Sequence, residues 1–331
     1  MRFLLPVLVA GVGFLAGCDA VPAANLFSNK QQRDEQSRSL VRQAVADLTS
    51  GAATAARGRI DSAVALRGGD GVAKTLVAIE LMELGRPEAA ERLLLPLLSQ
   101  RGATALPALG WGVLAMAAAK RGDTQAELQA RERALVQAKA VAARFGERPT
   151  SDIDRARRIR ELLDLAKFHA LPPADGKAVV AACREAVAVA RQSPVALSRL
   201  ARALADYADS DADRDSAVDT ALEAIQFQRE QQGNAIASAE LRDAYGWALL
   251  RRGRGDDSQA ALRVLGDAVE DQPENPELRF HFGMALAAGG QQERALVEIE
   301  RALLLRPDYP AAQIAKQELG ESARLDPAER R

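Results

Sequence analysis

Residues 276–310 read PELRFHFGMALAAGGQQERALVEIERALLLRPDYP, and the order of small and large residues in this stretch decides the fold. Gly283 and the alanines allow two antiparallel helices to approach closely, while Leu286 and Ile299 fill the space between them. Pro307 cannot continue a helix, so it ends the second one. The same residue types recur 34 residues earlier, at Ala261, Leu265, Ala268 and Pro273. We therefore expect repeated helix pairs.

The spacing in this stretch resembles the tetratricopeptide pattern W-x2-L-G-x2-Y…A-x3-F…P. Phe282-Gly283 stand at its Leu-Gly pair and Leu286 at its Tyr, while Arg279 replaces the early Trp. The later Ala, Phe, Ala and Pro positions hold Ala295, Ile299, Ala302 and Pro307. The resemblance implies an all-α, right-handed solenoid of tetratricopeptide-type helix pairs that binds a protein partner.

The repeat becomes degenerate toward the N-terminus but persists there. Gly85 stands at a turn, with Ala90 five residues later and Leu94 after it, and Trp111 and Gly122 mark another pair. About seven pairs are expected, and the resemblance is specific only over 239–310. The expected layout is a signal peptide at 1–17, a tether at 18–33, degenerate repeats at 34–145, a break at 146–150, repeats with a capping helix at 150–323, and a tail at 324–331.

Composition favours helix and argues against nucleic-acid binding. Alanine, leucine and arginine are helix formers and dominate the chain, which is 48% hydrophobic but only 4% aromatic. The net charge is −1, with 44 basic and 45 acidic side chains, so the counterion release that drives nucleic-acid binding lacks a basic face. The densest basic run, 155–160, is flanked by Asp154 and Glu161 and is expected to be a solvated helix face.

The first eighteen residues, MRFLLPVLVAGVGFLAGC, have the layout of a secretory signal peptide. Arg2 and the free amine supply positive charge, and a short apolar stretch leads to small residues. The stretch is too short for a spanning helix, which needs about 20 apolar residues, and Pro6 and two glycines interrupt it.

Leu15-Ala16-Gly17-Cys18 resembles the lipobox of bacterial lipoproteins. The resemblance implies cleavage between Gly17 and Cys18, a diacylglyceryl group on the Cys18 sulfur, and palmitate-type acylation of the new N-terminus. Lipidation of Cys18 leaves Cys183 as the one remaining thiol, so no internal disulfide is expected, and Cys183 is interpreted as a small buried hydrophobe.

The expected cellular location of the protein is the periplasmic side of the cell envelope. Asp19, second after processing, is the residue that retains lipoproteins at the inner membrane in enteric bacteria. Inner and outer membrane stay open, because Ala20 adds no second carboxylate and other bacteria do not all follow this rule.

No pattern in the sequence supports catalysis, a metal or a cofactor. His169 and His281 are far apart and lack spaced cysteines, and there is no phosphate-binding glycine loop and no nucleophile elbow. The acidic run 209–215 fails as a calcium loop, because Arg214 and Thr220 occupy the positions that require Gly and Glu. It is interpreted as a turn with an N-capping aspartate.

In tetratricopeptide proteins the ligand usually lies in the concave groove lined by the first helix of each pair. The resemblance places five residues there as partner-binding candidates: Asp243, Trp247, Arg251, Phe280 and Met284. Exposed aromatic residues beside an arginine are typical of a binding hot spot. Ordinary packing of Trp247 and Phe280 between repeats is the alternative.

The favoured hypothesis is therefore a lipid-anchored, non-enzymatic scaffold of an envelope assembly. Lipoproteins of similar build accompany tight-adherence and type IV pili, secretion and polysaccharide-export systems. The alternative is an accessory lipoprotein that binds or helps to process glycan or peptidoglycan, for which the 4% aromatic content is low. No small-molecule substrate is implied.

Overall fold

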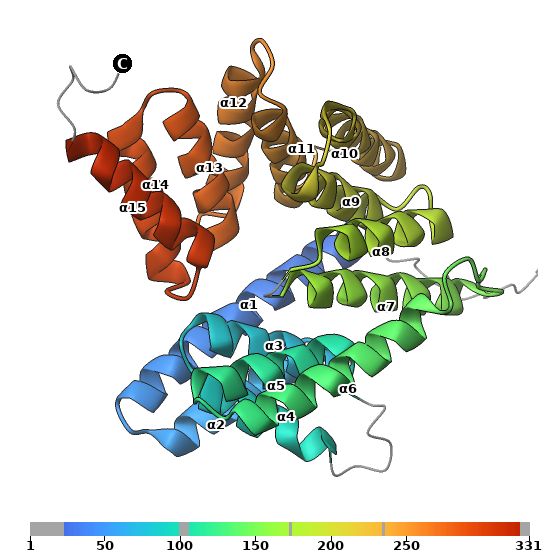
Figure 1. Cartoon of the computed structure of the whole chain (residues 1–331), viewed down its shortest axis with the longest axis vertical. Helices are drawn as coiled ribbons and strands as arrows, with labels where there is room; N and C mark the ends of the chain where they lie inside the picture. The colour runs from blue at the N-terminus through green and yellow to red at the C-terminus, as the bar shows by residue number, and fades with distance from the viewer. Residues whose placement is uncertain (1–22, 99–105, 172–173, 234–235, 325–331) are drawn as a thin grey trace, which may run out of the picture.

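The computed structural model describes residues 23–98, 106–171, 174–233 and 236–324, with side chains described between Gln32 and Glu321. Within these ranges the chain forms fifteen α-helices and no strand (Figure 1). The helices are α1 (Ala23–Thr49), α2 (Ala53–Leu66), α3 (Gly71–Glu83), α4 (Pro87–Leu98), α5 (Ala108–Lys120), α6 (Thr124–Ala142), α7 (Asp152–Ala170), α8 (Gly176–Val189), α9 (Pro194–Tyr207), α10 (Asp211–Gln232), α11 (Ala239–Arg252), α12 (Asp257–Asp271), α13 (Pro276–Ala288), α14 (Gln292–Leu305) and α15 (Pro310–Arg324).

Successive helices pack as pairs, so the chain is an all-α solenoid of tetratricopeptide-type units. α1 to α14 form seven pairs, and α15 packs against α14 at the C-terminal edge. The polar residues before many helices accept N–H groups of the first turn, which have no partner within a helix. Asp70 accepts from the N–H of Ala73 at 2.7 Å, and Asn275 accepts from the N–H groups of Glu277 and Leu278.

Two glycines let the helices of a pair approach closely, as the repeat pattern predicts. A Cβ atom on Gly283 would lie 2.9 Å from Ile299 Cγ1 and 3.2 Å from the Ala295 carbonyl oxygen. A Cβ atom on Gly246 would lie 2.6 Å from Leu265 Cγ. These contacts are shorter than carbon atoms tolerate, so α11/α12 and α13/α14 depend on glycine at the helix crossing.

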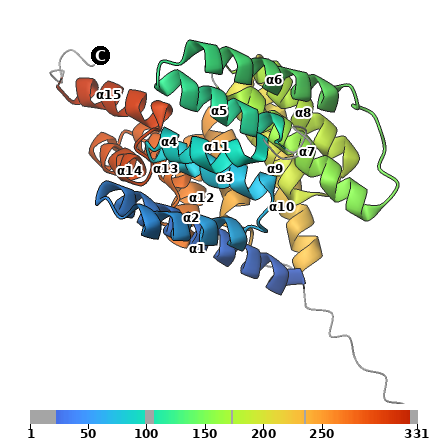
Figure 2. The same ribbon diagram turned by 90° about the horizontal axis from the view of Figure 1, so that it is seen from below.

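The buried apolar residues form two large clusters along the array. One extends through α1 to α6, and the other begins at α5 and continues to α15, with Phe168 of α7 packing against both. The array curls so that α13 to α15 lie near α1 and α3 in both views of the molecule (Figures 1 and 2). The clusters meet at α5 to α7, and polar contacts connect the two ends of the curl.

Three expectations change with the structure. Residues 23–33 were expected in an irregular tether but belong to α1, because Ala23, Ala24 and the following long side chains favour helix. The N-cap of the acidic run is Ser210, which accepts from the N–H of Asp213; an aspartate does not fill this position. The basic run at 155–160 is only partly a solvated face, because Arg158 is buried and donates to the Val141 carbonyl oxygen.

Other expectations are met or lie outside the described residues. α15 covers the predicted capping helix, and the predicted break at 146–150 lies between α6 and α7. Cys183 is buried, which raises the pKa of its thiol to about 11. The signal peptide, Gly17, Cys18 and Asp19 lie outside the described residues. In the described part of the chain, no helix has the length and apolar character needed to cross a membrane.

Candidate functional site on the inner face of the array

The structure places three of the five predicted groove residues inside the protein. Trp247 and Phe280 are each 7% exposed and Asp243 is 1% exposed, whereas Met284 is half-buried and Arg251 is exposed. Of the two interpretations left open by the sequence, the structure supports packing of both rings between repeats. Their physical role is packing between repeats, since burial of each ring removes a large apolar surface from water.

The aromatic residues connect three successive structural units. The rings of Trp247 on α11 and Phe280 on α13 have centroids 6.1 Å apart, and Phe280 lies 5.1 Å from Tyr309, just before α15. The indole N–H of Trp247 donates to Asp206 on α9 at 2.7 Å. Arg251 lies over the Trp247 ring and donates to the Ala205 carbonyl oxygen. These contacts fix the spacing of α9, α11 and α13.

A buried polar network lies beside these rings. His281 Nδ1 lies 2.6 Å from Asp243 Oδ1, and the imidazole stacks on Trp247 with centroids 4.1 Å apart. Arg202 of α9 pairs with Asp243 Oδ2 at 3.4 Å and donates to both oxygens of Glu277. A buried charge with this many partners is stabilised in place, whereas removal of one partner would leave an uncompensated charge.

The pKa values of this network follow from its pairing. Burial alone would raise the pKa of Glu277, but Arg202, His281 and Arg199 more than compensate and hold it well below its usual range. Burial would lower the pKa of Arg202, but Glu277 and Asp243 raise it above its ordinary value. Both groups therefore stay ionised in the folded protein, and their positions on α9 and α13 are fixed.

Arg199 lies one turn before Arg202 and differs from it in having no partner. It forms no hydrogen bond and no ion pair with any described residue. Its side chain is exposed to solvent, yet burial within the protein, followed by the charge of Arg202, lowers its pKa. The negative charges of Glu277 and Glu240 oppose this change and raise the pKa of Arg199.

We call the surface lined by Arg199, Arg202, Glu240 and Glu277 the inner face. Its residues come from the first helices α9, α11 and α13, as the repeat resemblance predicts for a ligand surface. Sequence reasoning missed Arg199 and Arg202, because the repeat pattern is clear only from residue 239 onward. The available signal was a pair of arginines three residues apart in the apolar helix PVALSRLARALADY.

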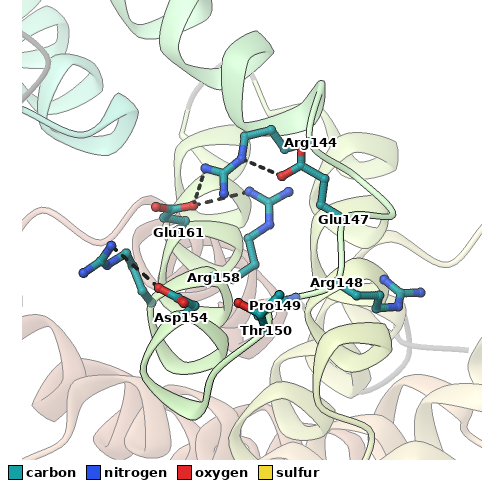
Figure 3. Close-up of a pocket in the computed structure, with 9 residues that line it drawn as sticks. Arg144, Glu147, Arg148, Pro149, Thr150, Asp154, Arg158 and Glu161 are labelled. Atoms are coloured by element: carbon teal, nitrogen blue, oxygen red, sulfur yellow. Dashed lines mark hydrogen bonds and ion pairs between the residues drawn. The ribbon is translucent and has the colours of Figure 1, made fainter.

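A separate hollow of about 270 Å³ lies between α6 and α7. Arg144 and Arg158 both point toward Glu161, each at 3.3 Å, and Arg144 also donates to Glu147 (Figure 3). Arg157 lies 3.9 Å from Asp154. Since these arginines already have acidic partners, the hollow offers a ligand no unpaired charge, and the inner face is the stronger candidate.

The described residues contain no group of three or more histidine, cysteine, aspartate or glutamate side chains able to hold a metal ion. His169 and His281 lie on different helices, α7 and α13. His281 is bonded to Asp243 and stacked on Trp247. This geometry gives His281 a structural role in the network.

The sequence matches no family model and no curated protein. Among solved structures, the chain is similar to tetratricopeptide-repeat proteins. The APC/C hetero-tetramer Cut9–Hcn1 is matched with TM-score 0.43 and 12% identity over 92% of this chain and 49% of that one. Yeast Tom70 is matched with TM-score 0.41 and 13% identity, over 93% of this chain and 59% of Tom70. MamA from Desulfovibrio magneticus RS-1 is matched with TM-score 0.32 and 18% identity, over 52% of this chain and 96% of that one. The chain thus spans about half the length of the first of these.

Proposed function

We propose that this protein is a membrane-anchored periplasmic scaffold that binds a segment of a protein partner on its inner face. The assembly it serves is an envelope system of the pilus, secretion or polysaccharide-export class. The observation that carries the binding part is Arg199, an unpaired guanidinium on the surface where repeats of this kind expose their first helices.

Arg199 also indicates the chemistry of the bound segment. A carboxylate of the partner would give Arg199 the direct ion pair that it forms with no described residue, in addition to the more distant charges of Glu277 and Glu240. A charge-assisted hydrogen bond between a guanidinium and a carboxylate is stronger than one between neutral groups. Arg202 is held by Asp243 and Glu277, so it supports the position of α9 and is not itself free to bind.

The anchor part of the proposal is supported by the lipobox resemblance of Leu15-Ala16-Gly17-Cys18. Several acyl chains on one residue exceed the single chain that gives only marginal membrane binding. Lipid on Cys18 would hold the array at the membrane surface, and Asp19 would favour the inner membrane. Labelling with radioactive palmitate tests this: Cys18→Ser should abolish both the label and detergent partitioning.

The binding part is tested by affinity capture from detergent-solubilised envelopes of the native host. Arg199→Gln should lose the captured partner, whereas Arg191→Gln should retain it. Arg191 is the matched control, because it is exposed, forms no contact with a described residue, and follows α8 outside the inner face. Equal capture by both variants would remove Arg199 from the binding site, and a captured protein without an envelope role would contradict the assembly class.

A further inference from the structure

The turn between α14 and α15 contacts the end of α3, far away in sequence. The N–H of Asp308 donates to the backbone oxygen of Glu83 at 3.0 Å. Arg306 Nη2 lies 2.8 Å from Glu83 Oε1. Lys120, the last residue of α5, lies 2.5 Å from Asp308 Oδ2. We call these four residues the clasp, because they connect the C-terminal repeats to the N-terminal ones.

A second contact of the same kind lies nearby. Arg42 of α1 pairs with Glu274 in the turn between α12 and α13. Two turns of the C-terminal part therefore contact helices of the N-terminal part. The described residues thus form a closed ring of helix pairs.

The side chains that close this ring form ion pairs and keep access to water. The side chains of Glu83, Arg306, Lys120 and Asp308 are between 26% and 37% exposed. The partly exposed pairs Lys120–Asp308 and Arg42–Glu274 contribute about 0 to 1 kcal/mol each, and salt screens them. Burial raises the pKa of Glu83 to about 7, so near neutral pH its pair with Arg306 is only partly ionised. The two large apolar clusters meet at α5 to α7, and the four side chains of the clasp belong to neither cluster. The closing contacts are therefore weak enough to open without unfolding the repeats.

The clasp adjoins the inner face. Tyr309 follows Asp308, packs on Phe280 of α13, and lies under the Arg306 guanidinium at 4.5 Å. The charge of Glu277, a residue of the inner face, acts on both Glu83 and Tyr309. The clasp therefore lies next to α13, the helix that carries Glu277 of the inner face.

We propose that the clasp holds the array shut as a ring and that it opens to admit a partner segment to the inner face. The closed ring is inferred from the contacts above. The entry of a partner segment into the inner face rests on the proposed function. A ring closed by weak polar contacts is a two-state element, open and closed, whose balance a partner can shift.

The test measures the distance between the two ends by pulsed electron spin resonance. Spin labels are placed on Asp61→Cys in α2 and Glu318→Cys in α15, in the Cys18→Ser full-length chain. Both positions are exposed and form no contact with a described residue. Cys183 stays unlabelled while the protein is folded, because its thiol is buried and its pKa is raised to about 11.

The open variant carries Lys120→Glu and Arg42→Glu, which place like charges opposite Asp308 and Glu274. The charge-swapped variant adds Asp308→Lys and Glu274→Arg, which restore both pairs. We expect one narrow distance distribution in the parent and the charge-swapped variant, and a longer, broader one in the open variant. An unchanged distribution in the open variant would overturn the clasp.

A second measurement needs no substitution in the clasp. Raising the salt concentration of the parent from about 0.1 M to about 1 M shortens the Debye length from about 10 Å to about 3 Å, so the distribution should broaden. A parent distribution that is broad at low salt, or narrow at both, contradicts a closed ring held by ion pairs. Labelling of Cys183 reports any unfolding.

Access to the inner face is measured with Arg199→Cys in the same Cys18→Ser chain. A bulky polyethylene-glycol maleimide should react severalfold faster in the open variant than in the charge-swapped variant, while N-ethylmaleimide should react equally with both. Equal rates for the bulky reagent would show that the clasp does not gate access. If the clasp opens and gates as expected but Arg199→Gln still captures its partner, the proposed function fails and the ring remains.

Discussion

The helix pairs α3/α4 and α13/α14 share one packing arrangement but differ in the residue at the helix crossing. Their turns contain Gly85 and Gly290, with φ of 73° and 75°. Seven residues before these glycines, Ala78 stands in the first pair where Gly283 stands in the second. Ala78 is fully buried, so α3/α4 accommodates the Cβ atom that α13/α14 excludes.

The large residues that fill the two pairs are equivalent in position and burial. At most 1% of each is exposed: Leu81 and Leu94 in the first pair, Leu286 and Ile299 in the second. The repeat is thus preserved as a pattern of side-chain size, with large residues fixed and the small residue free to vary. This explains why sequence similarity fades toward the N-terminus while the helix pairs continue.

The largest expected effect comes from emptying the shared core position. Leu94→Ala and Ile299→Ala should each destabilise the protein by about 2–5 kcal/mol, because each leaves a cavity between two helices. Urea denaturation followed by circular dichroism measures both. If Leu94→Ala were close to neutral while Ile299→Ala were not, the two pairs would not share a core.

Exchange of the crossing residues should destabilise in both directions. Gly283→Ala should cost about 1–3 kcal/mol, because its Cβ would press against Ile299 and the Ala295 carbonyl oxygen. Ala78→Gly should cost about 1 kcal/mol through lost helix propensity. Helix propensity alone predicts that Gly283→Ala stabilises, so a rise in melting temperature would refute the close-approach argument.

The two pairs also differ five residues after the crossing, where Glu83 in α3 corresponds to Ala288 in α13. Burial raises the pKa of Glu83 to about 7; Arg306 and Arg38 oppose this rise, and Glu80 and Glu277 add to it. The folded state therefore binds a proton more tightly than the unfolded state. Stability should fall as pH rises from about 4.5 through about 7, and this contribution is fully lost only above the folded-state pKa.

The change should be about 1–2 kcal/mol, less than the full pKa shift implies, because 26% of the Glu83 side chain is exposed. Urea denaturation at a series of pH values measures it. Glu83→Gln should flatten the profile, whereas Ala288→Gln, at the equivalent exposed position, should leave it unchanged. A profile that is equally steep in Glu83→Gln would assign the effect to other groups, among them Glu80, whose pKa burial also raises.

The smallest effect concerns the N-caps, which occupy equivalent positions in the two pairs. Asp70→Ala in α3 and Asn275→Ala in α13 should each cost about 1 kcal/mol, because each frees N–H groups of the first turn. Thermal melts measure both. Asp70→Asn and Asn275→Asp are the controls and should stay within a few tenths of a kcal/mol, since either side chain can cap. Loss of stability in these controls would mean that charge matters more than capping.

Much of the fold could be predicted from the sequence, because the size pattern is local. Gly283, Leu286 and Ile299 belong to one repeat, so their spacing in the sequence is fixed. The recurrence of similar residues 34 positions apart therefore reveals the repeat. The helical structure of residues 23–33 was missed, because that segment lacks the apolar periodicity on which the prediction relied.

The site was less accessible to sequence reasoning, because it depends on contacts between repeats. Trp247 and Phe280 were assigned to the ligand surface by their repeat positions, yet their burial depends on Tyr309 and Asp206, which other units supply. Arg199 is recognised as the unpaired arginine of α9 only when the acidic partners of Arg202 are known. The clasp joins residues more than 180 positions apart, which no repeat pattern contains.

The clasp also restricts how this protein could have changed in evolution. An open solenoid can gain or lose a repeat by gene duplication or deletion, since each unit contacts only its neighbours. Here an added helix pair would move the 306–309 turn beyond Glu83, and a deleted pair would keep the turn from reaching Glu83. Either change would break the contact between them. Ring closure therefore selects for a fixed repeat number, and homologues with another count should lack the charge pairs at Glu83 and Lys120.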